Sequence, residues 1–471
     1  VYFQFTVLSL FGLLADWLRS RGLIATRAQQ ELEKQKDFAR LDNHFAAMYV
    51  NNIYRMASEV VNRPLCGVPS TVVKLKDRTT NDYGWTYQLG GETEVLNLGS
   101  YNYLGFSQRE GPCADAAVAA IDRYGITVSG TRHEMGTHVE QQRMEEQVAR
   151  FLGVEEAIVF PMGFGTSSMN IPALVDEGSL IVSDELNHSS LILGSRLSKA
   201  HIVIFKHNDY RDCERVIRNA LCQPSPKTGK PYNKMLLIIE GIYSMEGTIV
   251  NLPEFIRIKK KYRAYLFIDE AHSIGALGAS GKGVVEYWGC DPRDVDVMMG
   301  TLTKSFAGAG GYLGGARATI RHIRTTCAGS CYGPGAMSPP IIAQIRTAMR
   351  IMQGEDGTDL GERKARQLER NTRYFRRSLK RMGYTVYGHD ESPVIPVMTY
   401  YLTKVVSYGR ETLNRKLAIV SVGYPATPLT MARVRFCISA DHTKEQLDHA
   451  LSIAAEVGDI TGTKYSIPTQ D

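Results

Sequence analysis

The chain has 471 residues, of which 44% are hydrophobic and 22% are charged. These values are typical of a folded globular protein and exclude both a disordered chain and a small disulfide-stapled scaffold. A net charge of +6 is too small for this length to indicate a nucleic-acid partner. The eight cysteines include no CxxC pair, so we expect no metal site and a reducing compartment.

Residues 1–14 (VYFQFTVLSLFGLL) are mostly apolar and are followed by Trp17, Arg19 and Arg21. The run is shorter than the roughly 20 residues of a membrane-spanning helix, and it lacks the basic start and cleavage site of a signal peptide. Aromatic and basic residues at its end suit a membrane–water interface. We expect residues 1–24 to form an amphipathic, membrane-associated helix; an ordinary buried helix is the alternative.

Residues 25–98 combine two patterns. A charged helical pattern extends to about residue 62 and is broken by Pro64 and Pro69, and an alternating pattern typical of short antiparallel strands follows over residues 72–98. We treat 25–98 as one N-terminal segment.

From residue 99, short apolar runs end in polar or glycine-rich turns, with helical stretches between them. The clearest runs are 157–165, 179–188, 201–209, 235–247, 264–275 and 295–305. This pattern predicts an α/β fold with a mostly parallel sheet covered by helices on both faces. We expect a large domain over residues 99–352 and a smaller α+β domain over 353–471, which begins with a charged helix.

Polar side chains at the ends of these runs are the candidates for chemistry, because ligands of such sheets bind beyond the carboxyl ends of the strands. Asp269 ends one apolar run, and a buried carboxylate needs a partner unless it serves as a helix N-cap. Lys304 follows another run; a lone lysine there is more often a solvated strand end, but a lysine in a partly dry pocket can lose its proton and bond to an aldehyde cofactor. His272 could face the same cavity.

Pyridoxal phosphate is a cofactor that needs such a lysine, an acid opposite its ring nitrogen and a phosphate cradle. The turn at Gly163, Phe164 and Gly165 enters a helix and offers free N–H groups to a phosphate, with Thr301 beside it. His188, at another strand end, could cover the ring; taken alone, it is more often a core histidine.

Other glycine motifs fail. The segment at Gly308 lacks the third glycine of a dinucleotide fingerprint, because position 313 is Leu, and Lys282 is followed by Gly283 where a P-loop has Ser or Thr. No HExxH or GxSxG motif occurs.

Five strings carry a family resemblance: residues 100–106 (SYNYLGF), 184–190 (DELNHSS), 240–247 (EGIYSMEG), 269–275 (DEAHSIG) and 300–306 (GTLTKSF). In this order they resemble the α-oxoamine synthases, pyridoxal-phosphate enzymes of the aspartate-aminotransferase fold (fold type I). Within that family the chain is most similar to the long, lysine-bearing subunits of eukaryotic serine palmitoyltransferases. The similarity continues through residues 425–428 (PATP) and covers almost the whole chain.

The resemblance implies a role for each matching residue. Lys304 would bond to the cofactor, Asp269 would pair with its ring nitrogen, His272 would contact its hydroxyl and His188 would stack on its ring. Its phosphate would lie at Gly163, Phe164, Gly165 and Thr301, and Ser244 would also contact the cofactor. Arg435 would bind the amino-acid carboxylate, with Arg433 as the rival, and Tyr101 and Asn102 would lie at the substrate.

The reaction implied by the resemblance is the decarboxylative condensation of L-serine with palmitoyl-CoA to 3-oxosphinganine, the first step of sphingolipid synthesis. The resemblance also implies a heterodimer with a homologous short subunit that lacks the lysine, a small activating subunit and Orm-type regulators. It implies a location at the endoplasmic-reticulum membrane with the catalytic domain in the cytosol.

The chain departs from many relatives at four places. Tyr101-Asn102 stands where they have Asn-Asp, and Gly423-Tyr424 precedes Pro425 where bacterial enzymes of this activity carry an arginine. Gln141 stands in place of the usual histidine. Gly335-Ala336 replaces a Thr-Ser pair that in relatives reaches the phosphate of the neighbouring subunit. A glycine-using aminolevulinate- or oxobutyrate-type synthase, an 8-amino-7-oxononanoate synthase and a catalytically silent scaffold subunit remain as alternatives.

Overall fold

The computed structural model describes residues 1–24, 37–39, 43–331, 333 and 335–468. A seven-stranded sheet in the order β3-β9-β8-β7-β6-β4-β5 forms its centre. The strands are β3 (Glu156–Phe160), β4 (Ser179–Asp184), β5 (His201–Phe205), β6 (Lys234–Glu240), β7 (Tyr265–Asp269), β8 (Val297–Thr301) and β9 (Gly311–Gly315). β9 is antiparallel to its neighbours β3 and β8, and the other pairs are parallel. The prediction of an α/β fold with a mostly parallel sheet is confirmed.

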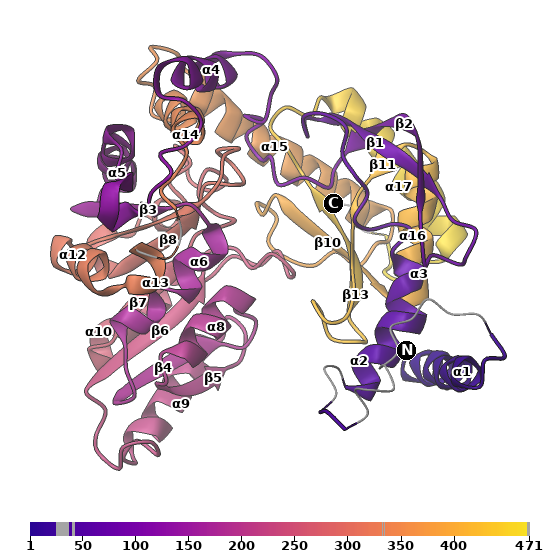
Figure 1. Ribbon diagram of the computed structural model, residues 1–471, viewed down its shortest axis with the longest axis horizontal. Coiled ribbons are helices and arrows are strands. Elements are labelled where there is room, and N and C mark those ends of the chain that lie inside the picture. Colours follow the sequence, from indigo (N-terminus) through magenta and orange to yellow (C-terminus); the bar gives the residue numbers. More distant parts are fainter. Residues whose placement is uncertain (25–36, 40–42, 332, 334, 469–471) are drawn as a thin grey trace.

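Helices cover both faces of this sheet (Figure 1). In β6, Leu237 and Ile239 belong to one core cluster while Leu236 and Ile238 belong to another, because successive side chains of a strand point to opposite faces. Burial on both sides explains why the strands are uninterrupted apolar runs. The first cluster includes side chains of α5 (Val139–Leu152), α9 (Tyr210–Leu221), α10 (Leu252–Tyr262) and α14 (Pro339–Met352), and the second those of α7 (Ile171–Leu174), α8 (Ser189–Leu197) and α12 (Arg317–Thr326).

The antiparallel strand β9 was missed by the sequence analysis. Three of its five residues are glycine, a residue depleted in strands. Glycine is required there because a Cβ on Gly311 would lie 2.8 Å from the Gly300 carbonyl oxygen, and one on Gly315 would lie 2.4 Å from that of Asp296. Close backbone approach, which leaves no trace in hydropathy, therefore determines this strand.

The C-terminal part contains the long charged helix that the sequence predicted, α15 (Leu360–Arg381), and two small sheets. One sheet has the order β10-β13-β12 and the other β1-β2-β11, so the N-terminal hairpin shares a sheet with C-terminal residues (Figure 1). The proposed domain boundaries stay a prediction. The strands of the two small sheets are β1 (Val72–Thr79), β2 (Gln88–Asn97), β10 (Val394–Tyr400), β11 (Leu417–Ala418), β12 (Val420–Val422) and β13 (Ala432–Cys437). The remaining helices are α4 (Pro112–Tyr124), α11 (Val284–Tyr287), α13 (Ala328–Cys331), α16 (Leu402–Asn414) and α17 (Lys444–Thr461), with the short π-helix η3 (Arg132–Gly136) and the short 3-10 helix η4 (Pro292–Asp294).

The apolar N-terminal run forms helix α1 (Tyr2–Ser20), and the helical expectation for it is confirmed. Among the described residues, no helix is long and apolar enough to cross a membrane. The helical prediction for 25–62 is met where α2 (His44–Tyr49), η2 (Val50–Tyr54) and α3 (Arg55–Ala57) follow one another; residues 25–36 and 40–42 lie outside the described residues. All eight cysteines are free thiols.

Candidate active site

Three neighbouring strands of the large sheet end in polar residues that the fold brings to one edge. β6 ends at Glu240, β7 at Asp269 and β8 at Thr301, and Glu240 is the register partner of Asp269. Both acids are buried, at 6% and 4% exposure. These polar side chains therefore lie together at the carboxyl end of the sheet, and we take this edge as the candidate site.

Lys304 follows β8 by three residues and is only partly exposed. Burial lowers the pKa of its amine to about 8, and the neighbouring carboxyl groups of Asp269 and Glu240 oppose this shift. Burial likewise raises the pKa of Asp269, while the Ala271 N–H that donates to its Oδ1 at 2.8 Å and the nearby Lys304 lower it. Lys304 and Asp269 thus interact electrostatically at this edge of the sheet, and about a tenth of the amine is uncharged at pH 7.

His272 lies close to Lys304, and two tyrosine side chains contact its ring. Its Nδ1 is 2.8 Å from the Tyr103 hydroxyl, and its ring meets the Tyr101 ring edge-on with centroids 5.4 Å apart. Burial lowers the pKa of His272 well below its usual value, with further contributions from the cations Lys304 and Arg435. The imidazole of His272 is therefore neutral at this site.

His188 is an exposed residue at the start of α8. It is the N-cap of α8, and its Nδ1 accepts from the Ser190 N–H at 3.3 Å and lies 2.8 Å from the Ser190 hydroxyl. Its main-chain N–H donates to Glu240 Oε1. The ring is oriented by these contacts, and the residue is exposed.

The glycine-rich turn after β3 begins helix α6 (Gly163–Ser168) next to Thr301. A Cβ on Gly163 would lie 2.7 Å from Thr301 Oγ1, so only glycine allows this approach. Thr301 Oγ1 donates to the Gly310 carbonyl at 3.1 Å. Phe164 is 42% exposed, and its ring is 6.1 Å from that of His188. The turn therefore lies beside Thr301 through Gly163 and beside His188 through Phe164.

Arg433 and Arg435 lie on one face of β13 and are both 2% exposed, yet their partners differ. Arg433 forms an ion pair with Glu246 at 3.2 Å and donates to the Met245 carbonyl at 2.6 Å. Arg435 donates to the Ser244 carbonyl at 3.0 Å and to the Tyr101 hydroxyl. In the described part of the chain, no carboxylate pairs with Arg435 and its Nε has no partner. Of these two arginines, Arg433 is paired with a carboxylate and Arg435 is not.

The structure does not bring every predicted residue into contact. The Asn102 side chain serves its own loop, with Nδ2 donating to the Pro69 carbonyl at 3.3 Å and Oδ1 accepting from the Ser107 N–H at 3.2 Å. Ser244 contributes its carbonyl oxygen rather than a recorded side-chain contact. Sequence reasoning assigned no role to Glu240 or Tyr103, although both lie inside the quoted strings; their positions at a strand end and in the loop before α4 were the available signals.

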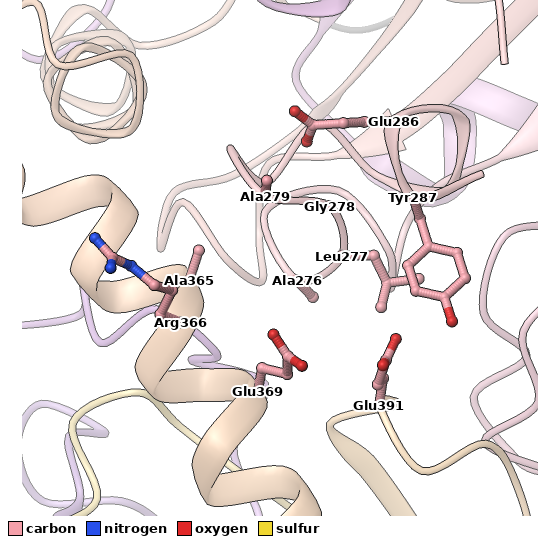
Figure 2. Close-up of a pocket in the computed structure, with 10 residues that line it drawn as sticks. All are labelled: Ala276, Leu277, Gly278, Ala279, Glu286, Tyr287, Ala365, Arg366, Glu369 and Glu391. Carbon is pink, nitrogen blue, oxygen red and sulfur yellow. The ribbon is translucent and has the colours of Figure 1, made fainter. Parts of the chain in front are cut away.

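A cavity of about 320 Å³ lies elsewhere, between the 276–279 turn and α15 (Figure 2). None of the predicted site residues lines it. Two of its acids already have partners, since Glu286 accepts from the Ser280 N–H at 3.1 Å and Glu391 from Arg373. We do not assign the site to this cavity.

Comparisons with known proteins agree with this arrangement. The family model described as aminotransferase class I and II matches residues 93–453. The chain is 58% identical to serine palmitoyltransferase 3 of Caenorhabditis elegans, over 100% of this chain and 92% of the relative.

Two solved structures extend the likeness to the fold. The serine palmitoyltransferase of Sphingomonas wittichii has a TM-score of 0.78 and 27% identity, covering 90% of this chain and 99% of its own. A structure named as SPT with PLP has a TM-score of 0.72 and 27% identity, covering 80% of this chain and 90% of its own. The chain therefore belongs to the serine palmitoyltransferases within the class I and II aminotransferase family.

Proposed function

We propose that this chain is a lysine-bearing catalytic subunit that condenses L-serine with palmitoyl-CoA, with loss of CO₂, to give 3-oxosphinganine. One observation carries the proposal: the Lys304 amine and the Arg435 guanidinium lie over the same Tyr101 ring, at 5.8 and 5.0 Å from its centroid. Burial lowers the pKa of Lys304 to about 8 against the effect of the nearby buried Asp269, and no carboxylate pairs with Arg435 among the described residues. The likeness to named serine palmitoyltransferases supports the substrates.

The residues present fit pyridoxal phosphate. The amine of Lys304 has no hydrogen-bond partner among the described residues, the approach of Gly163 to Thr301 leaves backbone N–H groups at the start of α6 for a phosphate, and the ring of His188 is exposed. Lys304 would bond to the cofactor, Asp269 would hold a proton at its ring nitrogen and His188 would lie over its ring. His272, kept neutral by burial, would meet its hydroxyl. When bound, the cofactor serves as an electron sink for the bond broken at the serine Cα.

The chain's own groups then divide the remaining work. Arg435 binds the serine carboxylate, and its contacts with the Ser244 carbonyl and Tyr101 fix the plane of the guanidinium, so that the carboxylate is oriented as well as bound. The Lys304 amine, whose pKa burial lowers to about 8, is the group that would take the proton from the serine Cα.

The test is Lys304→Ala in the purified enzyme with its partner subunit, with Lys282→Ala as a matched surface control. Lys304→Ala is expected to abolish 3-oxosphinganine formation, and Lys282→Ala to retain it. Adding L-serine, glycine and L-alanine separately while recording the visible cofactor band checks the amino acid. A strongest response to glycine would contradict the serine assignment, and product formation by Lys304→Ala would make this chain a scaffold.

We further propose that α1 lies on a membrane surface. Phe3, Leu10, Leu14 and Trp17 recur at helical spacing and are 51–83% exposed. The opposite side of α1 packs on the protein, where Gly12 approaches Met48. Such a helix binds in the interface without crossing the bilayer. Sedimentation with anionic vesicles is expected to decrease several-fold when Phe3, Leu10 and Trp17 are replaced by Ser; replacement of three exposed polar residues elsewhere is the control.

The proposed location is the endoplasmic-reticulum membrane, with the catalytic part in the cytosol, and the proposed partners are the short subunit, a small activating subunit and Orm-type regulators. Exposed apolar side chains on α8 (Ile192, Leu193 and Leu197, at 36–56%) support a subunit interface near the site. Coexpression followed by size-exclusion chromatography tests it. Leu193→Asp is expected to release the short subunit while leaving this chain folded.

A further inference from the structure

Glu240 is a buried acid for which the reaction described above has no use. It ends β6, directly beside Asp269 in the parallel register, so the two carboxyl side chains leave the same face of the sheet on strands roughly 4.8 Å apart. Neither acid has an Arg or Lys ion pair within the described part of the chain. Two buried carboxylates this close do not both ionise readily, because each negative charge disfavours the other.

The environment of Glu240 distinguishes it from Asp269. Burial, together with the negative charge of Asp269, raises the pKa of Glu240 well above its usual value, and Asp184 adds to this effect. The opposing groups are the His188 N–H and Lys304, and Lys304 is the residue that the cofactor uses. The titratable groups around Glu240 are Asp184, His188, Tyr243, Asp269 and Lys304.

The contact that Glu240 makes is with the main chain of His188. The turn that carries His188 is attached to β6 at two points: Asn187 Nδ2 donates to the Ile238 carbonyl at 2.9 Å, and the His188 N–H donates to Glu240 Oε1. The ring itself is oriented by Ser190. Glu240 therefore holds the His188 backbone at the end of the sheet together with Asn187, and Ser190 orients the ring.

We propose that Glu240 is a positioning residue that acts as an uncharged hydrogen-bond acceptor, holding the His188 backbone so that its ring covers the cofactor, and leaving Asp269 as the single negative charge beneath the ring. The inference rests on the proposed function, since it assumes pyridoxal phosphate between His188 and Asp269. It differs from a charge role, in which Glu240 would act as a second counter-ion to the cofactor.

Three variants of the full chain with its partner subunit separate these roles. Glu240→Gln keeps the accepting oxygen and the volume but cannot ionise, Glu240→Met keeps the volume but cannot accept, and Glu185→Gln removes a carboxylate from the same turn without touching His188. The measurements are the dissociation constant of pyridoxal phosphate, from fluorescence titration of the cofactor-free protein, and the pH midpoint of its visible absorption band.

Glu240→Gln and Glu185→Gln are expected to leave the dissociation constant within about threefold and the midpoint within about 0.3 pH units. Glu240→Met is expected to raise the dissociation constant about tenfold, the loss of one directed hydrogen bond at a ligand-covering residue. A Glu240→Gln midpoint lowered by about one unit or more would overturn the proposal, because it would show that a negative charge had been removed. Unchanged affinity in Glu240→Met would also overturn it.

If Glu240→Met does not fold, Glu240→Leu tests the missing acceptor in its place, and Glu240→Gln still tests the charge: a retained midpoint supports the proposal, and a midpoint lowered by about one unit or more overturns it. Failure of the unaltered protein to bind pyridoxal phosphate would count against the proposed function rather than against Glu240, so the two failures are distinguishable.

Discussion

Arg435 and Arg433 offer a test of how much a partner decides the role of a side chain. Both are buried arginines two residues apart on β13, and the sequence alone separated them only by register. We expect Arg435→Lys to weaken L-serine binding and Arg433→Lys to leave it nearly unchanged. Lysine keeps the charge in both variants, so the comparison measures the geometry of the planar, two-pronged donor.

The magnitude follows from the contacts. Hydrogen bonds to a charged group contribute about 1.5–3 kcal/mol, so loss of a two-pronged carboxylate contact at Arg435 should raise the serine dissociation constant about 10- to 100-fold. Arg433 already donates to Met431, Met245 and Glu246 at 3.0, 2.6 and 3.2 Å, which leaves little for a substrate. Its replacement should lower stability and change serine binding less than about threefold.

The assay is titration of the cofactor-loaded complex with L-serine, followed in the visible absorption band, with a thermal unfolding midpoint for each variant. Tyr101→Phe serves as an intermediate case, because it removes only the hydroxyl that accepts from Arg435. If Arg433→Lys weakens serine binding tenfold while Arg435→Lys does not, the reasoning from partners is wrong and the roles are exchanged.

Three further predictions concern the pH dependence and the stability of the protein. With a pKa of about 8, the neutral fraction of Lys304 rises from roughly a tenth at pH 7 to roughly nine tenths at pH 9, so the rate of loading cofactor-free protein should rise about tenfold over that range; a flat profile would contradict it. Tyr103→Phe removes the hydrogen bond to His272 and should lower stability by about 1 kcal/mol, read as a lower thermal midpoint, and an unchanged midpoint would show that the bond contributes nothing. Glu145→Gln leaves the buried Arg132 without its counter-charge and should cost about 3 kcal/mol in unfolding free energy; an unchanged unfolding midpoint would contradict it.

The large sheet and the ends of its strands were predictable because their signals are local. A strand buried on both faces must be apolar along its whole length, and the first polar residue after it marks the edge where ligands bind. This reasoning reached Asp269 and Lys304 without coordinates. The family resemblance then assigned chemistry to these residues, and helices such as α15 followed from their periodicity.

Other features of the site depended on which segments lie beside one another. The pairing of Glu240 with Asp269, the ion pair that occupies Arg433 and the glycine-rich strand β9 join residues far apart in the chain. Hydropathy and spacing describe a residue's neighbours along the chain, whereas register and close backbone approach depend on neighbours across space. The sequence by itself therefore determined which residues reach the edge of the sheet, and only the tertiary structure decided which of them carry an unpaired charge there, because charge pairing and desolvation are properties of the packed interior.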